Sequence, residues 1–259
     1  MRLFLLVTVV IFFLFGTLNA QDLSSYKKKV FQMDGKQMPY RLLLPKNYSQ
    51  EKEYPLILVL HGSGERGNDN EAQLIHGADL FLKENNYNKY PAIVVFPQCA
   101  KNSSWARVDV SGDWENRKFT FYKRQEPTED MLLLEGLIKS LKKEYGINND
   151  QMYVGGLSMG GMGIFELVRR NPKMFVAAFP ICGGANPAIA NKIKKTRWWV
   201  FHGENDNVVP SKYSTQMVNA LQKVDSDVTY SLYPNVEHNS WDNAFAEVEL
   251  LPWLFSISK

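Results

Sequence analysis

Short apolar runs alternate with amphipathic segments along most of this 259-residue chain. Uninterrupted apolar runs of this kind are typical of strands that are buried on both faces of a sheet. Each run is followed by a polar loop rich in glycine, asparagine or aspartate, which marks the point where the strand ends. The strands predicted in this way are Pro55–Leu60, Ala92–Phe96, Met152–Val154, Val176–Ile181, Trp198–Phe201 and Val228–Leu232.

Segments with helical spacing of apolar residues separate these runs. Two earlier strands, Lys28–Met33 and Met38–Leu44, flank Asp34 and Gly35, a turn signal that predicts a hairpin. The alternation predicts an α/β protein with a mostly parallel central sheet and helices on both faces. The predicted helices lie near Ala72–Leu82 and over Glu129–Tyr145, Gly163–Arg170, Ser211–Lys223 and Asn243–Phe255, the last interrupted or kinked at Pro252.

One segment between a predicted strand and a predicted helix carries a candidate nucleophile. Residues 155–161 read Gly-Gly-Leu-Ser-Met-Gly-Gly and place the pattern Gly-x-Ser-x-Gly around Ser158. A strand–turn–helix context is typical of a nucleophile elbow, and Gly156 and Gly160 lack the side chains that would clash there. Met159 opens the helix, so its backbone N–H is free to bind an oxyanion. The alternative is a glycine-rich turn with an incidental serine.

A serine nucleophile needs a histidine base and a carboxylate that orients this base. Only His202 and His238 follow Ser158 in the chain. His202 closes an apolar run, whereas His238 lies in a polar loop after a later strand. Asp206 stands between them, so the order Ser158, Asp206, His238 is the chain order that such a scaffold requires. The alternatives are Glu204 as the acid and a His238 that is only a surface loop residue.

The loop after Pro55–Leu60 offers a second oxyanion donor. It reads His-Gly-Ser-Gly-Glu-Arg-Gly over residues 61–67, and its glycines let the backbone approach a substrate closely. We expect the backbone N–H of Ser63 to act together with that of Met159, with Gly64 as the next candidate. A phosphate-binding loop is the competing interpretation, but the pattern Gly-x-x-x-x-Gly-Lys-Ser/Thr is absent from the sequence.

With these motifs the chain resembles the α/β-hydrolase family from about Lys27 to about Phe255. It looks most similar to small secreted esterases related to the polysaccharide (feruloyl and acetyl) esterases, whose relatives include prolyl-oligopeptidase-like predicted peptidases. The resemblance implies the α/β-hydrolase fold and a Ser-His-Asp triad, and it says little about the substrate. The segments that carry it are Leu60–Glu65, Phe96–Cys99, Gly156–Gly161, His202–Pro210 and His238–Trp241.

The N-terminus has the features of a signal peptide over residues 1–20. Arg2 precedes the apolar run Leu3–Phe15, and small residues lead to an expected cleavage site after Ala20. The run is short for a membrane span, which leaves an uncleaved anchor as the alternative. Residues 21–259 then form a single catalytic domain of ordinary size, secreted or periplasmic. A formal net charge of +3 without a long basic run argues against nucleic acid as a partner.

Two cysteines follow the signal segment, Cys99 and Cys182, and each lies just after a predicted strand. In the sheet order expected for the fold, two strands separate them, which places them roughly 14 Å apart at about 4.8 Å per strand. A disulfide tolerates Cα separations of only up to about 7 Å, so we expect two free, buried thiols. No Cys-x-x-Cys or His-Glu-x-x-His spacing occurs, and no metal or other cofactor is expected.

The stretch Ala100–Glu126 is long for a connection, and such connections in compact domains are often functional. Its aromatic residues alternate with basic ones, a pattern also found in proteins that bind single-stranded nucleic acid. Because it leaves the strand beside the predicted oxyanion strand, we expect a lid or a substrate wall. We assign substrate contacts to Trp105 and Trp114 within it and to Trp241, close to His238. The alternative is a structural excursion whose aromatic residues pack on the core.

Together these features predict a secreted serine hydrolase that cleaves small-molecule or carbohydrate esters through an acyl-enzyme. The catalytic residues are Ser158, Asp206 and His238, and no stable membrane insertion is expected after signal cleavage. Ester hydrolysis is favoured over peptide hydrolysis because the chain has no room for a large extra domain to grip a polypeptide. A prolyl-oligopeptidase-like peptidase and a non-catalytic member of the fold remain the alternatives.

Overall fold

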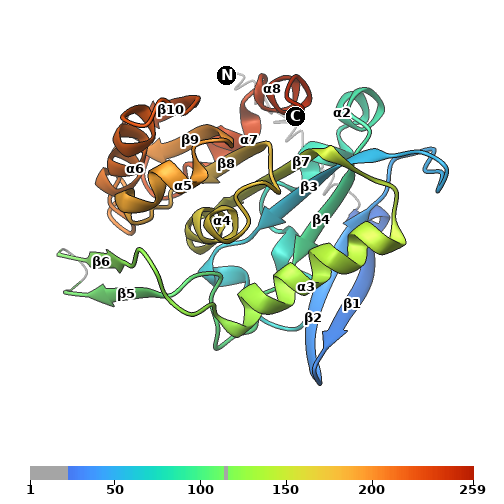
Figure 1. Cartoon of the computed structure of the whole chain (residues 1–259), viewed down its shortest axis with the longest axis horizontal. Helices are drawn as coiled ribbons and strands as arrows, with labels where there is room; N and C mark the ends of the chain where they lie inside the picture. Colours follow the sequence, from blue (N-terminus) through green and yellow to red (C-terminus); the bar gives the residue numbers. More distant parts are fainter. Residues whose placement is uncertain (1–22, 114–115) are drawn as a thin grey trace, which may run out of the picture.

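In a computed structural model of the protein, residues 23–113 and 116–259 are described, and eight strands among them form one sheet (Figure 1). The first two strands and their neighbour β4 pair antiparallel, and all later pairs are parallel. From one edge to the other the strands are β1 (Lys27–Met33), β2 (Lys36–Leu43), β4 (Ile93–Pro97), β3 (Tyr54–Leu60), β7 (Ile147–Leu157), β8 (Ala177–Ile181), β9 (Arg197–Gly203) and β10 (Val228–Tyr233).

Helices cover both faces of the sheet, because the side chains of each central strand alternate between two apolar clusters. In β3, Leu56 and Leu58 belong to one cluster, and Ile57 and Val59 belong to the other. The first face is covered by α3 (Glu129–Glu144), α4 (Met159–Arg170), α5 (Ala190–Ile193) and α6 (Lys212–Gln222). The second is covered by α1 (Ala78–Leu82), α7 (Trp241–Ala246) and α8 (Leu250–Phe255), with α2 (Glu84–Lys89) beside them.

The predicted α/β class, the N-terminal hairpin and the central strands are confirmed, and three differences have simple causes. The predicted helix near Ala72–Leu82 is interrupted at Gly77, whose φ of 80° is left-handed, so only a short 3₁₀ turn (Ala72–Leu74) and α1 form. β7 begins at Ile147, five residues before the predicted Met152–Val154. Its first half is polar and therefore gave no apolar run, but Ile147 pairs with Tyr54 of β3.

The C-terminal helix is two helices, α7 and α8, with the break before α8 rather than at Pro252. Pro252 is the third residue of α8. A proline is tolerated in the first turn because the N–H groups there have no acceptor within the helix. Among the helices of the described residues, none is long and apolar enough to cross a bilayer. The predicted signal peptide, residues 1–20, lies outside the described residues.

The long connection after β4 contains a hairpin that the sequence pattern did not predict. Its strands, β5 (Val108–Ser111) and β6 (Lys118–Phe121), pair antiparallel with each other and form a separate two-stranded sheet. In Figure 1 this hairpin extends from the main body beneath α4 and α6. It is the part of the fold that builds one wall of the cavity described below.

The two cysteines lie on strands that are not neighbours, as predicted. Cys99 follows β4 and Cys182 follows β8, and β3 and β7 lie between these strands. Both side chains are buried, and both are free thiols. The prediction of two unpaired thiols is therefore confirmed at the level of the fold.

Candidate active site

Ser158 stands on a sharp turn between β7 and α4. Its backbone angles, φ 54° and ψ −116°, are ones that residues with a side chain rarely adopt, which indicates stored strain. The turn is held by the backbone N–H of Ser158, which donates to the carbonyl of Ile181 at 2.9 Å. On the other side, the N–H of Met162 donates to the carbonyl of Ser158 at 3.0 Å. This is the geometry expected of a nucleophile elbow.

Two glycines let the end of β3 approach this turn. A Cβ at Gly156 would lie 2.3 Å from the carbonyl oxygen of Leu60, and a Cβ at Gly160 would lie 2.1 Å from the same oxygen. Real side chains do not tolerate such contacts, so the close packing requires glycine at both positions. As a result, the loop that follows Leu60 comes to lie directly beside Ser158.

A chain of hydrogen bonds runs from Ser158 to a buried carboxylate. His238 Nε2 lies 3.0 Å from Ser158 Oγ, and His238 Nδ1 lies 2.7 Å from Asp206 Oδ2. The three residues come from the β7–α4 turn, the loop after β9 and the loop after β10, all at the carboxyl ends of parallel strands. The structure thus brings together the three residues that the sequence predicted as a set.

The environment of Asp206 keeps it charged. Its side chain is fully buried, and its Oδ1 accepts the backbone N–H groups of Val208 and Val209, each at 2.9 Å. Burial alone would raise the pKa of this carboxyl, but hydrogen bonds from His202 and His238 outweigh burial and hold the pKa well below its ordinary value. Glu204, the alternative acid, is exposed, so the geometry favours Asp206.

The residues of the two predicted oxyanion donors, Ser63 and Met159, line the same cavity as Ser158. Met159 is the first residue of α4, where a backbone N–H has no acceptor within the helix. Ser63 begins a 3₁₀ turn (Ser63–Glu65), and a Cβ at its neighbour Gly62 would lie 3.6 Å from the Cβ of Ser158. The loop that carries Ser63 and the first turn of α4 are thus both next to Ser158.

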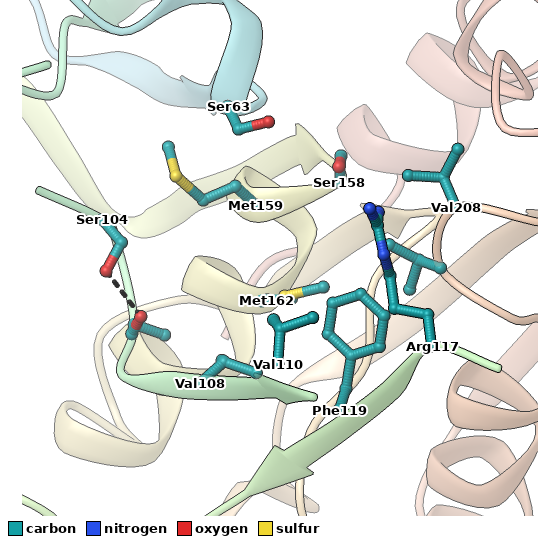
Figure 2. A pocket seen from close by; sticks show the side chains of 12 residues that line it. Ser63, Ser104, Val108, Val110, Arg117, Phe119, Ser158, Met159, Met162 and Val208 are labelled. Carbon is teal, nitrogen blue, oxygen red and sulfur yellow. Dashed lines mark hydrogen bonds between the residues drawn. The ribbon is translucent and has the colours of Figure 1, made fainter. Parts of the chain in front are cut away.

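Ser158 faces a cavity of about 250 Å³. One wall comes from the β5–β6 hairpin, another from α4, and a third from the loop after β9. Figure 2 shows Val110 and Phe119 of the hairpin pointing toward Met162 of α4. The apolar side chains that line this cavity are Ala106, Val108, Val110, Phe119, Met159, Met162, Val208 and Val209, and the polar ones are Ser63, Ser104, Arg117 and Ser158.

One group of potential metal ligands in the described part of the chain overlaps this site. The ligand atoms of Cys182, Asp206 and His238 lie within 4.8 Å of one another. However, the Asp206–His238 pair is already hydrogen-bonded at 2.7 Å, and burial followed by the Asp206 charge raises the pKa of the Cys182 thiol well above its ordinary value. A neutral thiol is a poor ligand. The arrangement therefore fits proton transfer between Ser158, His238 and Asp206.

A family model described as "Putative esterase" matches residues 32–254 of the chain. The chain belongs to this esterase family. Among curated relatives, the "Bifunctional acetylxylan esterase/xylanase XynS20E" of Neocallimastix patriciarum is 29% identical over 157 residues, which cover 60% of this chain and 20% of the relative. The "Probable feruloyl esterase C" of Aspergillus oryzae is 25% identical over 171 residues, 66% of this chain and 56% of the relative.

A solved structure described as a thermostable esterase superposes on this chain with a TM-score of 0.81 and 33% identity, covering 91% of this chain and 64% of the other. The chain spans less than two thirds of the length of each of these three proteins. The agreement with the solved structure confirms the α/β-hydrolase fold.

The three tryptophans predicted as substrate contacts have different outcomes. Trp105 is fully buried, and its Nε1–H donates to the carbonyl of His61 at 3.0 Å, so the prediction that it lines the site is wrong. Trp114 lies outside the described residues. Trp241 is half-buried beside His238, with ring centroids 5.3 Å apart, and its ring also contacts that of His76, tilted by 46°. It flanks His238 from outside the cavity.

Sequence reasoning missed His61 as part of the candidate active site. Its Nε2 accepts the backbone N–H of Cys99 at 2.9 Å, which leaves the proton on Nδ1, 2.6 Å from the carbonyl of Gly62. The imidazole thereby ties the loop that carries Ser63 to the end of β4, and the edge of Trp105 covers it. The position of His61 directly after the apolar run, at the start of the glycine loop, was the available signal.

Proposed function

We propose that this protein is a carboxylic ester hydrolase that works through an acyl-enzyme. The observation that carries the proposal is the hydrogen-bonded chain from Ser158 through His238 to the buried Asp206 carboxylate, at the wall of an apolar cavity. Membership of the esterase family supports the same activity.

The mechanism follows from which atom can carry which proton. Asp206 accepts the proton on His238 Nδ1, which leaves His238 Nε2 as the acceptor that faces Ser158 Oγ. As Ser158 attacks the ester carbonyl, His238 takes its proton, and the charge of Asp206 stabilises the resulting imidazolium. His238 then gives the proton to the departing alcohol. In the second half of the reaction, His238 takes a proton from a water molecule as this water attacks the acyl carbon. His238 then returns the proton to Ser158 Oγ, and the acid is released.

The negative charge that develops on the carbonyl oxygen needs donors that are already in place. The backbone N–H groups of Met159 and Ser63 fill this role, because their positions are set by α4 and by the loop that Gly62 packs against Ser158. Removing one such donor typically costs about 10²- to 10³-fold in kcat. Fixed backbone donors need no rearrangement during the reaction.

The substrates proposed are esters whose acyl group fits an apolar cavity of about 250 Å³, including acyl groups carried on carbohydrates. The cavity lining is dominated by valine, methionine and phenylalanine side chains, which favour an apolar or aromatic acyl group. The relatives named for acetylxylan and feruloyl esters support carbohydrate esters as the natural class. We further propose export, with cleavage of the signal peptide after Ala20.

The decisive experiment is turnover of p-nitrophenyl acetate by purified residues 21–259 and by Ser158→Ala. The wild type should hydrolyse the ester, and the variant should lose activity by up to about 10⁶-fold, as at comparable nucleophiles. Ser256→Ala, at an exposed serine in the last turn of the chain, is the matched control and should keep full activity. A Ser158→Ala protein that retains more than about a hundredth of the wild-type rate would refute the proposal. A folded wild type without turnover would favour a non-catalytic member of the fold.

A further inference from the structure

A second histidine, His202, contacts the same carboxylate oxygen that orients His238. His202 lies near the end of β9, and its side chain is fully buried. Its Nε2 is 3.1 Å from Asp206 Oδ2, the atom that also receives His238 Nδ1 at 2.7 Å. It is also 2.8 Å from the carbonyl oxygen of Val209. Nothing in the mechanism above uses this residue.

The surroundings of His202 determine where its proton lies. Both groups that face Nε2, the carboxylate of Asp206 and the carbonyl of Val209, only accept hydrogen bonds, so Nε2 carries the proton and donates. On the other side of the ring, Nδ1 is 2.7 Å from Ser214 Oγ in α6, and this hydroxyl lies 2.9 Å from the carbonyl of Gly183. The imidazole is therefore fixed between β9, α6 and the loop after β8.

The carboxylate of Asp206 has all its hydrogen-bonding positions occupied. Oδ1 accepts two backbone N–H groups, and Oδ2 accepts one imidazole N–H from each histidine. The other titratable group at this carboxylate in the described residues is the Cys182 thiol, which burial keeps neutral. His202 and His238 thus compete for the charge on a single oxygen atom.

We propose that His202 is a positioning residue of the esterase. It holds Asp206 Oδ2 in line with His238, and by sharing the charge of this oxygen it keeps His238 in the unprotonated form that accepts the proton of Ser158. The inference rests on the proposed function, because it gives His202 a role only if His238 acts as a base. Its consequence is an esterase that stays active at lower pH than a triad with a single histidine donor.

Two amide variants separate this role from simple packing. A glutamine at position 202 places its amide nitrogen near the position of Nε2 and keeps a donor toward Asp206. An asparagine places its amide nitrogen near the position of Nδ1 and keeps only the contact with Ser214. Both variants are neutral, and both replace an imidazole by a smaller amide. A difference between them therefore reports the hydrogen bond to Asp206.

The test is the pH profile of kcat/KM for p-nitrophenyl acetate in wild type, His202→Gln and His202→Asn. For His202→Asn we expect a loss of about 10- to 100-fold in kcat with little change in KM, as for loss of a hydrogen bond to a charged group. Its acid limb should move to higher pH by about half to one unit, because Asp206 Oδ2 then accepts a hydrogen bond from His238 alone and stabilises its protonated form more strongly. His202→Gln should recover most of the rate and of the acid limb. Equal behaviour of the two variants, or a loss without any movement of the limb, would overturn the proposal.

A measurement on the wild type keeps the proposal testable if the asparagine variant does not fold. In ¹⁵N-histidine-labelled protein, His202 Nε2 should appear as a protonated nitrogen with a slowly exchanging proton throughout the active pH range. His61 provides the internal reference, because its Nε2 accepts the N–H of Cys99 and carries no proton. An unprotonated Nε2 on His202 would overturn the inference. A wild type that shows this proton but hydrolyses no ester would refute the proposed function instead.

Discussion

Single buried residues fix the backbone groups around Ser158, and His61 is the clearest case. Its two ring nitrogens join the end of β4 to the loop that carries Ser63, and its own carbonyl accepts the indole N–H of Trp105. Burial lowers the pKa of His61 from 6.5 to about 4. The neutral imidazole is the form that fits, because only an unprotonated Nε2 can accept the N–H of Cys99.

This buried histidine gives the folded state a defined pH dependence. Because the pKa of His61 is lower in the folded than in the unfolded chain, the unfolded chain binds more protons between about pH 6.5 and 4. The stability it contributes is complete above pH 6.5 and is lost as the pH falls toward 4, by roughly 3 kcal/mol. Urea unfolding at pH 7 and pH 4.5 measures this loss. The loss should be clearly smaller in His61→Gln, and an equal loss in both proteins would show that another group is responsible.

The acid of the triad is tested by two neighbouring carboxylates. Asp206→Asn should lower kcat by about 10⁴-fold, because the amide favours the wrong tautomer of His238. Glu204→Gln should change kcat by less than about threefold, because Glu204 is exposed while Asp206 Oδ2 is 2.7 Å from His238. Steady-state kinetics on p-nitrophenyl acetate compares the two. A larger loss in Glu204→Gln would reverse the assignment.

The sequence predicted those individual residues that can be recognised from their order along the chain. It missed those whose role depends on how side chains pack in the folded protein. Ser158, Asp206 and His238 are the members of a known order, and glycines mark the turn around the serine. Trp105 sits in a polar stretch whose periodicity says nothing about which aromatic ring faces the core. Its burial depends on a backbone contact with His61, which is 44 residues away in the chain.

Among the secondary-structure elements, the β5–β6 hairpin has the most direct influence on the substrate. It contributes Val108, Val110 and Phe119 to the cavity, and the ring of Phe119 packs against Tyr213 of α6. The sequence indicated that this stretch has a function but did not predict its strands. Each strand is only four residues long and contains no buried residue, and the apolar residues alternate with charged and polar ones. Short alternations of this kind are weak signals without a partner strand.

Phe119 should favour aromatic acyl groups through ring stacking. We expect Phe119→Ala to lower the ratio of kcat/KM for a feruloyl ester over an acetyl ester by roughly 2- to 12-fold, with lost burial adding to this change. Thr120→Ala is the matched control, since Thr120 is the next residue of β6 and is exposed. The measurement is kcat/KM for both esters in all three proteins. An unchanged ratio in Phe119→Ala would assign the hairpin a purely structural role.

In the molecule as a whole, the functional groups lie together at the edge of the sheet where its parallel strands end. Ser158, Asp206, His238 and the loop at Gly62 all follow the carboxyl ends of β7, β9, β10 and β3. The sequence was sufficient for this arrangement because buried parallel strands are continuous apolar runs. It was insufficient where helix boundaries depend on a local turn, as at Gly77 and before α8, because propensity alone does not fix where such a helix ends.

The strand order also predicts the redox state of the two cysteines in protein made in an oxidising compartment. Cys99 and Cys182 should both be free after purification from an oxidising compartment, because β3 and β7 separate their strands. Alkylation under denaturing conditions without reductant, followed by intact-mass measurement, should show two additions. Additions that appear only after reduction would establish a disulfide and contradict the strand order.

The hairpin that walls the cavity forms backbone pairs only with itself among the strands of the described residues. Residues can therefore be inserted, deleted or exchanged near its tip without shifting the register of any strand in the main sheet. Substitutions in the hairpin can therefore change which acyl groups fit the cavity, while Ser158, His238 and Asp206 keep their positions. A hairpin grafted from a relative should therefore change the hairpin wall of the cavity while leaving the geometry of Ser158, His238 and Asp206 unchanged.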